Sequence, residues 1–170
     1  MVAALELYFD PPAERRFRML WDALEEERVP TLRELSHKRY RPHLSLVVAD
    51  ELEPVAVQAT LDGLAPALPL ALSFQYTGVF VGRVLWLGPA PTAALLAHQA
   101  EVWRRLTGGG IELWPQYAPG AWVPHSTLSM RVPRPVLSAA LRRCLEVLPI
   151  EATIISAAVA DHARGVLHPL

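Results

Sequence analysis

The sequence is poor in cysteine and lysine, and it has no excess of charge of either sign. Cys144 is the one cysteine and Lys38 the one lysine among 170 residues, and the formal net charge is −1. One cysteine excludes a disulfide within the chain and is typical of a protein in the reducing cytoplasm. Without a basic excess, we do not expect the many phosphate contacts that hold long nucleic acids. Any anionic ligand is therefore expected to be small or bound by a few local groups.

Long apolar segments are also absent. No stretch of about 20 residues is free of both charge and proline, so we expect no membrane-spanning helix. The start, MVAALELYFD, lacks the basic beginning and long apolar centre of a signal peptide, which also favours a cytoplasmic location. Hydrophobic residues make up 52% of the chain, as in a folded globular protein. With no low-complexity linker, residues 1–170 are expected to form a single domain.

Strand-like and helical patterns interleave along the chain. Alternating or continuous apolar runs predict strands over 4–9, 43–48, 68–80 and 83–88, around His125, and over 152–161 and 166–168. Apolar residues at helical spacing predict helices over 13–28, 53–64, 91–106 and 135–148. Asp10, followed by two prolines, is a candidate cap for the first helix. The hairpin expected around Gly82 argues against a purely parallel sheet, so we predict an α+β fold.

A short motif occurs twice, once in RPHLSLVV and once in VPHSTLSM. Both copies contain proline, histidine, any residue, a hydroxyl residue and leucine. The polar residues are His43 and Ser45 in the first copy, and His125 and Thr127 in the second. Because side chains alternate along a strand, each histidine shares a face with its hydroxyl residue, and the leucines face a core. We therefore expect a duplication that places each motif on a central strand, facing the other across a cleft.

Two histidines and two hydroxyls in one cleft suit reactions of a phosphodiester. Imidazoles have ordinary pKa values of about 6.5, so one can serve as base and the other as acid near neutral pH. The hydroxyls of Ser45 and Thr127 can donate hydrogen bonds to the non-bridging phosphate oxygens. With an acid and a base on opposite sides of phosphorus, in-line displacement needs neither a metal nor another cofactor.

The two motifs and the order of elements resemble the 2H phosphoesterase superfamily, most closely its 2′-5′ RNA ligase-like and cyclic phosphodiesterase branch. The resemblance implies a two-lobed, pseudo-twofold α+β fold, with two antiparallel sheets around a central cleft and helices on the outside. It implies that His43 and His125 are catalytic and that Ser45 and Thr127 bind the phosphate. The implied reactions are opening of 2′,3′-cyclic phosphates, and making or breaking of 2′-5′ linkages, without metal or cofactor. The expected partners of this cytoplasmic, monomeric enzyme are RNA ends, oligonucleotides or small cyclic nucleotides, and no membrane.

Two arginines are candidates for substrate binding. Many relatives in this superfamily have an arginine just after the second motif, and here Arg131 lies one place later than expected. Arg131 shares the parity of His125 if the strand stays regular, and it is otherwise a solvated strand end. Arg41 ends the basic run HKRYR, which either attracts phosphates or forms a solvated loop.

Aromatic residues before the second motif form another candidate group. Tyr117 and Trp122, with Trp114, lie in an expected loop and would either stack on a base or pack beneath that loop. Three further histidines have no partner motif and are interpreted as surface or structural residues: His98, His162 and His168.

Two other functions fit the same motifs. The cleft could bind a nucleotide or RNA end without turnover, although both motifs retain the histidine and the hydroxyl. The histidines could instead be metal ligands, but neither motif contains a carboxylate and hydroxyls are poor ligands for zinc.

Overall fold

The computed structural model describes residues 2–34, 40–64 and 70–170. Its strands are β1 (Ala3–Phe9), β2 (His43–Ala49), β3 (Leu70–Phe80), β4 (Val84–Pro89), β5 (Ser126–Ser129), β6 (Ile150–Asp161) and β7 (Val166–Pro169). Its longer helices are α1 (Pro11–Glu26), α2 (Pro54–Leu61), α3 (Ala93–Gly108) and α4 (Leu137–Val147). Each predicted element is present, with its ends moved by a few residues. Within the described ranges, no helix is both long and apolar enough to cross a membrane.

The strands are antiparallel and are hydrogen-bonded in the order β2-β1-β6-β3-β4-β5, with β7 also paired to β6. The predicted α+β class is confirmed, with one difference in detail. The two expected sheets are joined into one, because the long strand β6 pairs with β3 through residues 150–154 and with β1 through residues 154–161. Each half of the sheet therefore continues into the other through a single strand.

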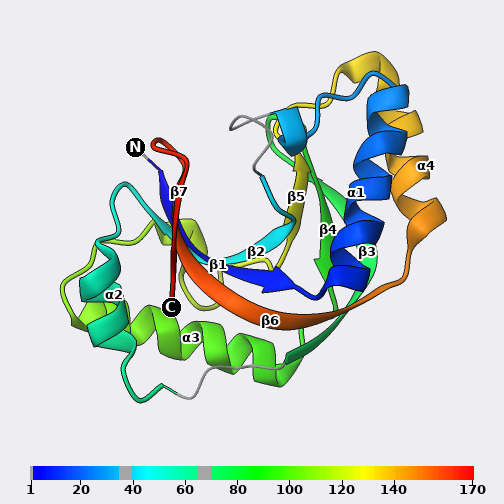
Figure 1. The fold of residues 1–170 in the computed structure, drawn as a ribbon. Coiled ribbons are helices and arrows are strands. Elements are labelled where there is room, and N and C mark those ends of the chain that lie inside the picture. Colours follow the sequence, from blue (N-terminus) through cyan, green and yellow to red (C-terminus); the bar gives the residue numbers. More distant parts are fainter. Residues whose placement is uncertain (1, 35–39, 65–69) are drawn as a thin grey trace.

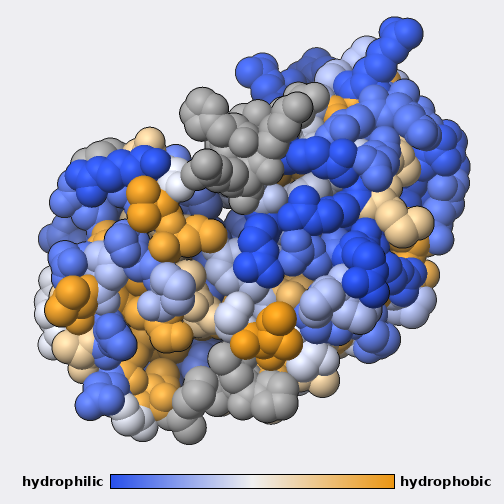
Figure 2. All heavy atoms as spheres, viewed as in Figure 1, coloured by the Kyte–Doolittle hydropathy of each residue, from blue (hydrophilic) through white to orange (hydrophobic). Residues whose placement is uncertain are grey.

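The helices cover the two halves of the sheet separately (Figure 1). Helices α2 and α3 pack on each other, and α3 also contacts β2. Helices α1 and α4 pack together at the other half, where α4 contacts β3. Figure 2, in the same view, shows a mainly hydrophilic surface over α1 and α4 and apolar residues on the side of β7. The helices therefore lie outside the curved sheet, as the predicted two-lobed arrangement requires.

Helix α1 is fixed to the sheet by its apolar face and by its first residues. The apolar face of α1 is buried, and the Phe17 ring centroid lies 5.2 Å from that of Phe9 in β1 and 5.1 Å from that of Phe74 in β3. Asp10 occupies the N-cap position, but its side chain accepts no hydrogen bond from the helix. Its Oδ1 instead accepts from the backbone N–H of Thr153, at 2.9 Å. The candidate cap therefore connects the helix start to β6.

The two motif strands are not central, contrary to our expectation. Strands β2 and β5 are the first and last in the hydrogen-bonded order, whereas β1 and β4 each pair with a strand on both sides. The sheet is curved, and β2 and β5 contact each other (Figure 1). The motifs therefore face each other from the two edges of one sheet.

A close contact between two paired residues shapes the β3–β4 hairpin beside β5. Gly78 is directly opposite Trp86, and a Cβ added to Gly78 would lie 2.1 Å from the Trp86 ring. The ring cannot move away freely, since its centroid is 4.9 Å from that of Phe80 and 6.0 Å from that of His125. Only glycine at position 78 leaves room for this ring.

Replacing Gly78 with alanine should therefore destabilise the protein. We expect Gly78→Ala to lower the free energy of unfolding by about 1–3 kcal/mol, the usual cost of overpacking, in chemical denaturation. Gly108→Ala is the matched control, because a Cβ there meets no atom within 4 Å and α3 favours alanine. Equal stability of the two variants would contradict the close packing at Trp86.

Candidate active site

The first motif lies at the beginning of β2. His43 and Ser45 point to one face of the strand, whereas Leu44 and Leu46 are fully buried in the core on the other. The second motif follows the same pattern, since His125 directly precedes β5 and Leu128 is buried. Because apolar burial is the main driving force for folding, these leucines fix the orientation of the polar residues between them. The predicted alternation of faces is thus confirmed.

The four polar motif residues line one cavity of about 440 Å³, together with aromatic residues from both halves of the fold. Tyr117 and Trp122 line this cavity, as predicted, and so does Trp114. Phe80 also contributes to its wall, and so do Tyr40 and His162, which the sequence patterns did not indicate. The cavity is within the usual size range of small-molecule sites, about 300–1,000 Å³.

Both motif histidines are oriented by the backbone in the same way. His43 Nδ1 lies 2.8 Å from the carbonyl oxygen of Arg41, and His125 Nδ1 lies 2.7 Å from that of Val123. A carbonyl oxygen only accepts hydrogen bonds, so each Nδ1 carries a proton and donates it. In each motif a proline separates the histidine from this carbonyl. Each ring therefore keeps its Nε2 for other partners.

His125 lies against the second half of the sheet, with its ring centroid 4.8 Å from that of Phe80. Burial lowers the pKa of His125, and the nearby His43 adds to this effect, while the carbonyl of Val123 acts in the opposite direction. His125 is consequently neutral at neutral pH, with an unprotonated Nε2. This is the state that a general base requires.

Comparison with known proteins agrees with this arrangement. The model of the 2′-5′ RNA ligase superfamily matches residues 9–166. The chain belongs to this superfamily. The resemblance inferred from the two motifs is thereby confirmed, and the chain is a member of a superfamily of phosphoesterases and RNA ligases.

Solved structures of the same fold include members with nucleotides bound. LigT of E. coli, in complex with 3′-AMP, has a TM-score of 0.64 and 18% identity, over 100% of this chain and 96% of that one. A protein described as a phosphoesterase has a TM-score of 0.62 and 20% identity, over 99% and 94%. Usb1 of Kluyveromyces marxianus, with uridine monophosphate, has a TM-score of 0.53 and 9% identity, over 99% and 98%. At these identities the likeness establishes the fold alone, and no curated protein matches the sequence.

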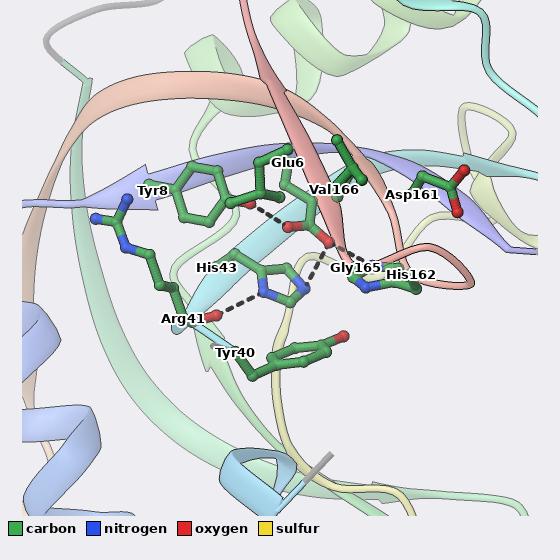
Figure 3. A pocket seen from close by; sticks show the side chains of 11 residues that line it. Glu6, Tyr8, Tyr40, Arg41, His43, Asp161, His162, Gly165 and Val166 are labelled. Atoms are coloured by element: carbon green, nitrogen blue, oxygen red, sulfur yellow. Dashed lines mark hydrogen bonds and ion pairs between the residues drawn. The ribbon is translucent and has the colours of Figure 1, made fainter. Parts of the chain in front are cut away.

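In the present protein, a second cavity of about 250 Å³ adjoins the first and shares Tyr40, His43 and His162 with it. The buried carboxylate of Glu6 lies between Tyr8, His43 and His162 (Figure 3). No sequence pattern indicated Glu6, since one acidic residue in an apolar strand carries no motif. His162 was interpreted as a surface or structural residue, and the structure instead places it beside His43, because the end of β6 lies next to β1.

The two arginines predicted to bind substrate, Arg131 and Arg41, do not line the first cavity. Arg131 is exposed and does not line the cavity, because β5 ends at Ser129 and the alternation of faces stops there. Arg41 lines the second cavity, where its guanidinium is 2.9 Å from Glu14 and lies over the Tyr8 ring. The rest of the predicted basic run lies outside the described residues: His37, Lys38 and Arg39. Among the residues that the structure describes, no group of three or more His, Cys, Asp or Glu is placed to hold a metal ion.

The edge of β2 is covered by side chains and a loop rather than by another strand. Trp122 Nε1 donates to the carbonyl of Ser45 at 3.1 Å, and the N–H of Trp114 donates to that of Val48 at 2.8 Å. The buried amide of Gln99 on α3 donates to the carbonyls of Leu46 (3.2 Å) and Tyr117 (2.7 Å). Gln99 thus connects the motif strand to the aromatic wall of the cavity.

Loss of this amide should weaken both the fold and ligand binding. We expect Gln99→Leu to lower the free energy of unfolding by about 1–3 kcal/mol, since two buried carbonyls lose their donor. The KM for a nucleotide substrate should also rise, because Tyr117 is no longer held. Gln58→Leu on the exposed face of α2 is the control. Denaturation and steady-state kinetics of both variants provide the measurements, and similar behaviour of the two would refute this role of Gln99.

Proposed function

We propose that the protein is a metal-independent phosphodiesterase that opens the 2′,3′-cyclic phosphates of RNA ends or nucleotides. The observation that supports this most directly is the meeting of two backbone-oriented imidazoles and two hydroxyls in one cavity. These groups supply an acid, a base and two phosphate donors, which is the set that in-line displacement at phosphorus needs.

In this mechanism, His125 is the general base. Its neutral Nε2 takes a proton from a water molecule, and the water oxygen attacks phosphorus. The bond from phosphorus to the ribose 3′ oxygen breaks, and His43 donates a proton to that oxygen. Ser45 and Thr127 donate hydrogen bonds to the non-bridging oxygens, where negative charge increases in the transition state. The products are a 2′-phosphate and a free 3′-hydroxyl, as the family resemblance implies.

The aromatic wall favours a nucleotide as the substrate. Trp114, Tyr117 and Trp122 line the cavity on the β2 side, and Phe80 lines it beside His125. Stacking of a base on such side chains contributes about 1–3 kcal/mol. Similar structures hold 3′-AMP and uridine monophosphate, which are of the expected size and class. If an RNA 5′-hydroxyl replaced water as the nucleophile, the same groups would form a 2′-5′ linkage.

A binding module without turnover is the alternative that the same cavity allows. It differs from the enzyme in one measurable respect, since a ligand would bind without being converted. Incubation of the purified protein with 2′,3′-cyclic mononucleotides, cyclic-phosphate-ended RNA and 2′-5′ dinucleotides separates the two. Tight binding with no product on any of them would favour the binding module.

Substitution of either motif histidine should greatly reduce turnover. We expect His43→Ala and His125→Ala each to lower kcat/KM by about 10²–10⁴-fold, the usual contribution of general acid–base catalysis. Ser45→Ala and Thr127→Val should have smaller effects, because each removes one donor while the other remains. His168→Ala, on an exposed residue of β7, is the control and should keep full activity. Wild-type rates in a folded histidine variant would end the two-histidine mechanism.

The product and the response to a chelator test the remaining features of the mechanism. Because side chains supply the acid, base and donors, the initial rate on a 2′,3′-cyclic nucleotide should not change in excess EDTA. Phosphorus NMR should identify the 2′-phosphate as product. A rate that is lost with EDTA and restored by a divalent ion would instead indicate a metal enzyme. A 3′-phosphate would show that the 2′ oxygen is the one beside His43.

A further inference from the structure

Glu6 is a carboxylate in the interior of the protein, with only 1% of its surface exposed. Three groups contact it. The Tyr8 hydroxyl donates to Oε2 at 2.5 Å, and the Nε2 atoms of His162 and His43 lie 2.7 and 3.2 Å from Oε1. Figure 3 shows these contacts from β1, β2 and the end of β6. A buried carboxylate is costly unless it is paired, so these contacts are what allow Glu6 to be charged.

The Glu6 carboxyl is ionised at neutral pH. Burial alone would raise its pKa, but the positive potential of His43, together with the hydrogen bonds from His162 and Tyr8, holds the pKa below its ordinary value. A carboxylate only accepts hydrogen bonds, so Tyr8 and His162, which are hydrogen-bonded to Glu6, must each present a proton to it. His162 satisfies this as a neutral ring with a proton on Nε2.

His43 is a favourable neighbour of the Glu6 carboxylate only as an imidazolium. Its Nδ1 proton is already donated to the carbonyl of Arg41, so a neutral ring would have a lone pair on Nε2. The electron-rich Nε2 of such a ring would lie 3.2 Å from a carboxylate oxygen, and the two would repel each other. A second proton on Nε2 turns this repulsion into an ion pair. The 3.2 Å contact is an ion pair without the alignment of a hydrogen bond, so the Nε2 proton remains free to move to a substrate oxygen.

We propose that Glu6 is a positioning residue that favours the protonated form of His43, and that Tyr8 and His162 hold the Glu6 carboxylate in place. This rests on the proposed function only where it makes His43 the acid of the reaction. After His43 gives its proton to the leaving oxygen, its neutral ring faces a carboxylate again. Glu6 therefore favours the return of a proton from solvent and prepares His43 for the next turnover.

The other groups around the pair do not titrate near neutral pH or are paired elsewhere. Burial and the charge of Glu6 raise the pKa of Tyr8 and of Tyr40, and raise that of Tyr117 to about 12, so the phenols stay neutral. Arg41 is bound to Glu14, and Asp161 lies 3.5 Å from Arg164. His125 faces His43 from the other half of the cavity. The remaining ionisable groups among these neighbours are the imidazoles of His43, His125 and His162.

NMR titration of the histidine rings tests the proposal without any need for turnover. In Glu6→Gln, which keeps the shape and removes the charge, the titration midpoint of His43 should fall by about one pH unit or more. The His43 signal is assigned by its loss in His43→Gln. Glu26→Gln, on the exposed face of α1, is the matched control and should leave the midpoint unchanged. An unchanged midpoint in folded Glu6→Gln would overturn the proposal.

The pH profile of kcat/KM provides the kinetic test. Loss of the acid's proton sets the alkaline limb, so this limb should move to lower pH in Glu6→Gln, while the acidic limb set by the base stays in place. A uniform fall in rate with an unchanged profile would reduce Glu6 to a structural role. If the wild-type protein shows no phosphodiesterase activity but the NMR midpoint moves, the proposed function fails and the control of His43 by Glu6 stands.

A second variant keeps the test valid if Glu6→Gln does not fold. Tyr8→Phe removes one donor from Glu6 while leaving the carboxylate ionised and beside His43. His162 still holds Glu6 beside His43, and the charge of Glu6 is less neutralised by hydrogen bonding, so the His43 midpoint should rise rather than fall. A midpoint equal to that of the wild type in Tyr8→Phe would count against the proposal.

Discussion

The site depends on one strand that pairs with both halves of the fold. Strand β6 binds β3 with its first residues and β1 with the rest, and Ile154 takes part in both pairings. Because the sheet is continuous and curved at this point, its two outer strands meet instead of diverging. The histidine of each motif thus comes from an opposite edge, and the space between them is set by backbone hydrogen bonds rather than by flexible side chains.

The two halves share a motif but give it different surroundings. Each histidine donates its Nδ1 proton to a carbonyl two residues earlier. His43 then faces the Glu6 carboxylate, whereas His125 faces the aromatic rings of Phe80 and Trp86. A charged partner favours the protonated ring, and an apolar environment favours the neutral one. Duplicated residues can thereby take opposite roles through their neighbours, without any change in the motif itself.

The interleaved patterns were enough to predict the fold class, and the repeated motif was enough to predict four residues of the central cavity, because strand alternation is a local property. Residue positions that depend on the pairing of strands far apart in the sequence could not be predicted. Arg131 was assigned by extending the alternation past Ser129, where the strand ends. Glu6 and His162 belong to elements far apart in sequence and meet only because β1 pairs with β6. The edge positions of β2 and β5 likewise follow from strand order, which no single segment of the chain encodes.

The long-range pairing of β6 has a consequence for how the protein is made. During synthesis, β1 leaves the ribosome long before β6, the strand that joins it to the second half of the sheet. Until residues 150–161 emerge from the exit tunnel, β1 lacks its pairing with β6, and the two motifs do not belong to one sheet. The site is therefore expected to form only after β6 has been translated, and until then the exposed strand edges of the nascent protein are candidates for chaperone binding.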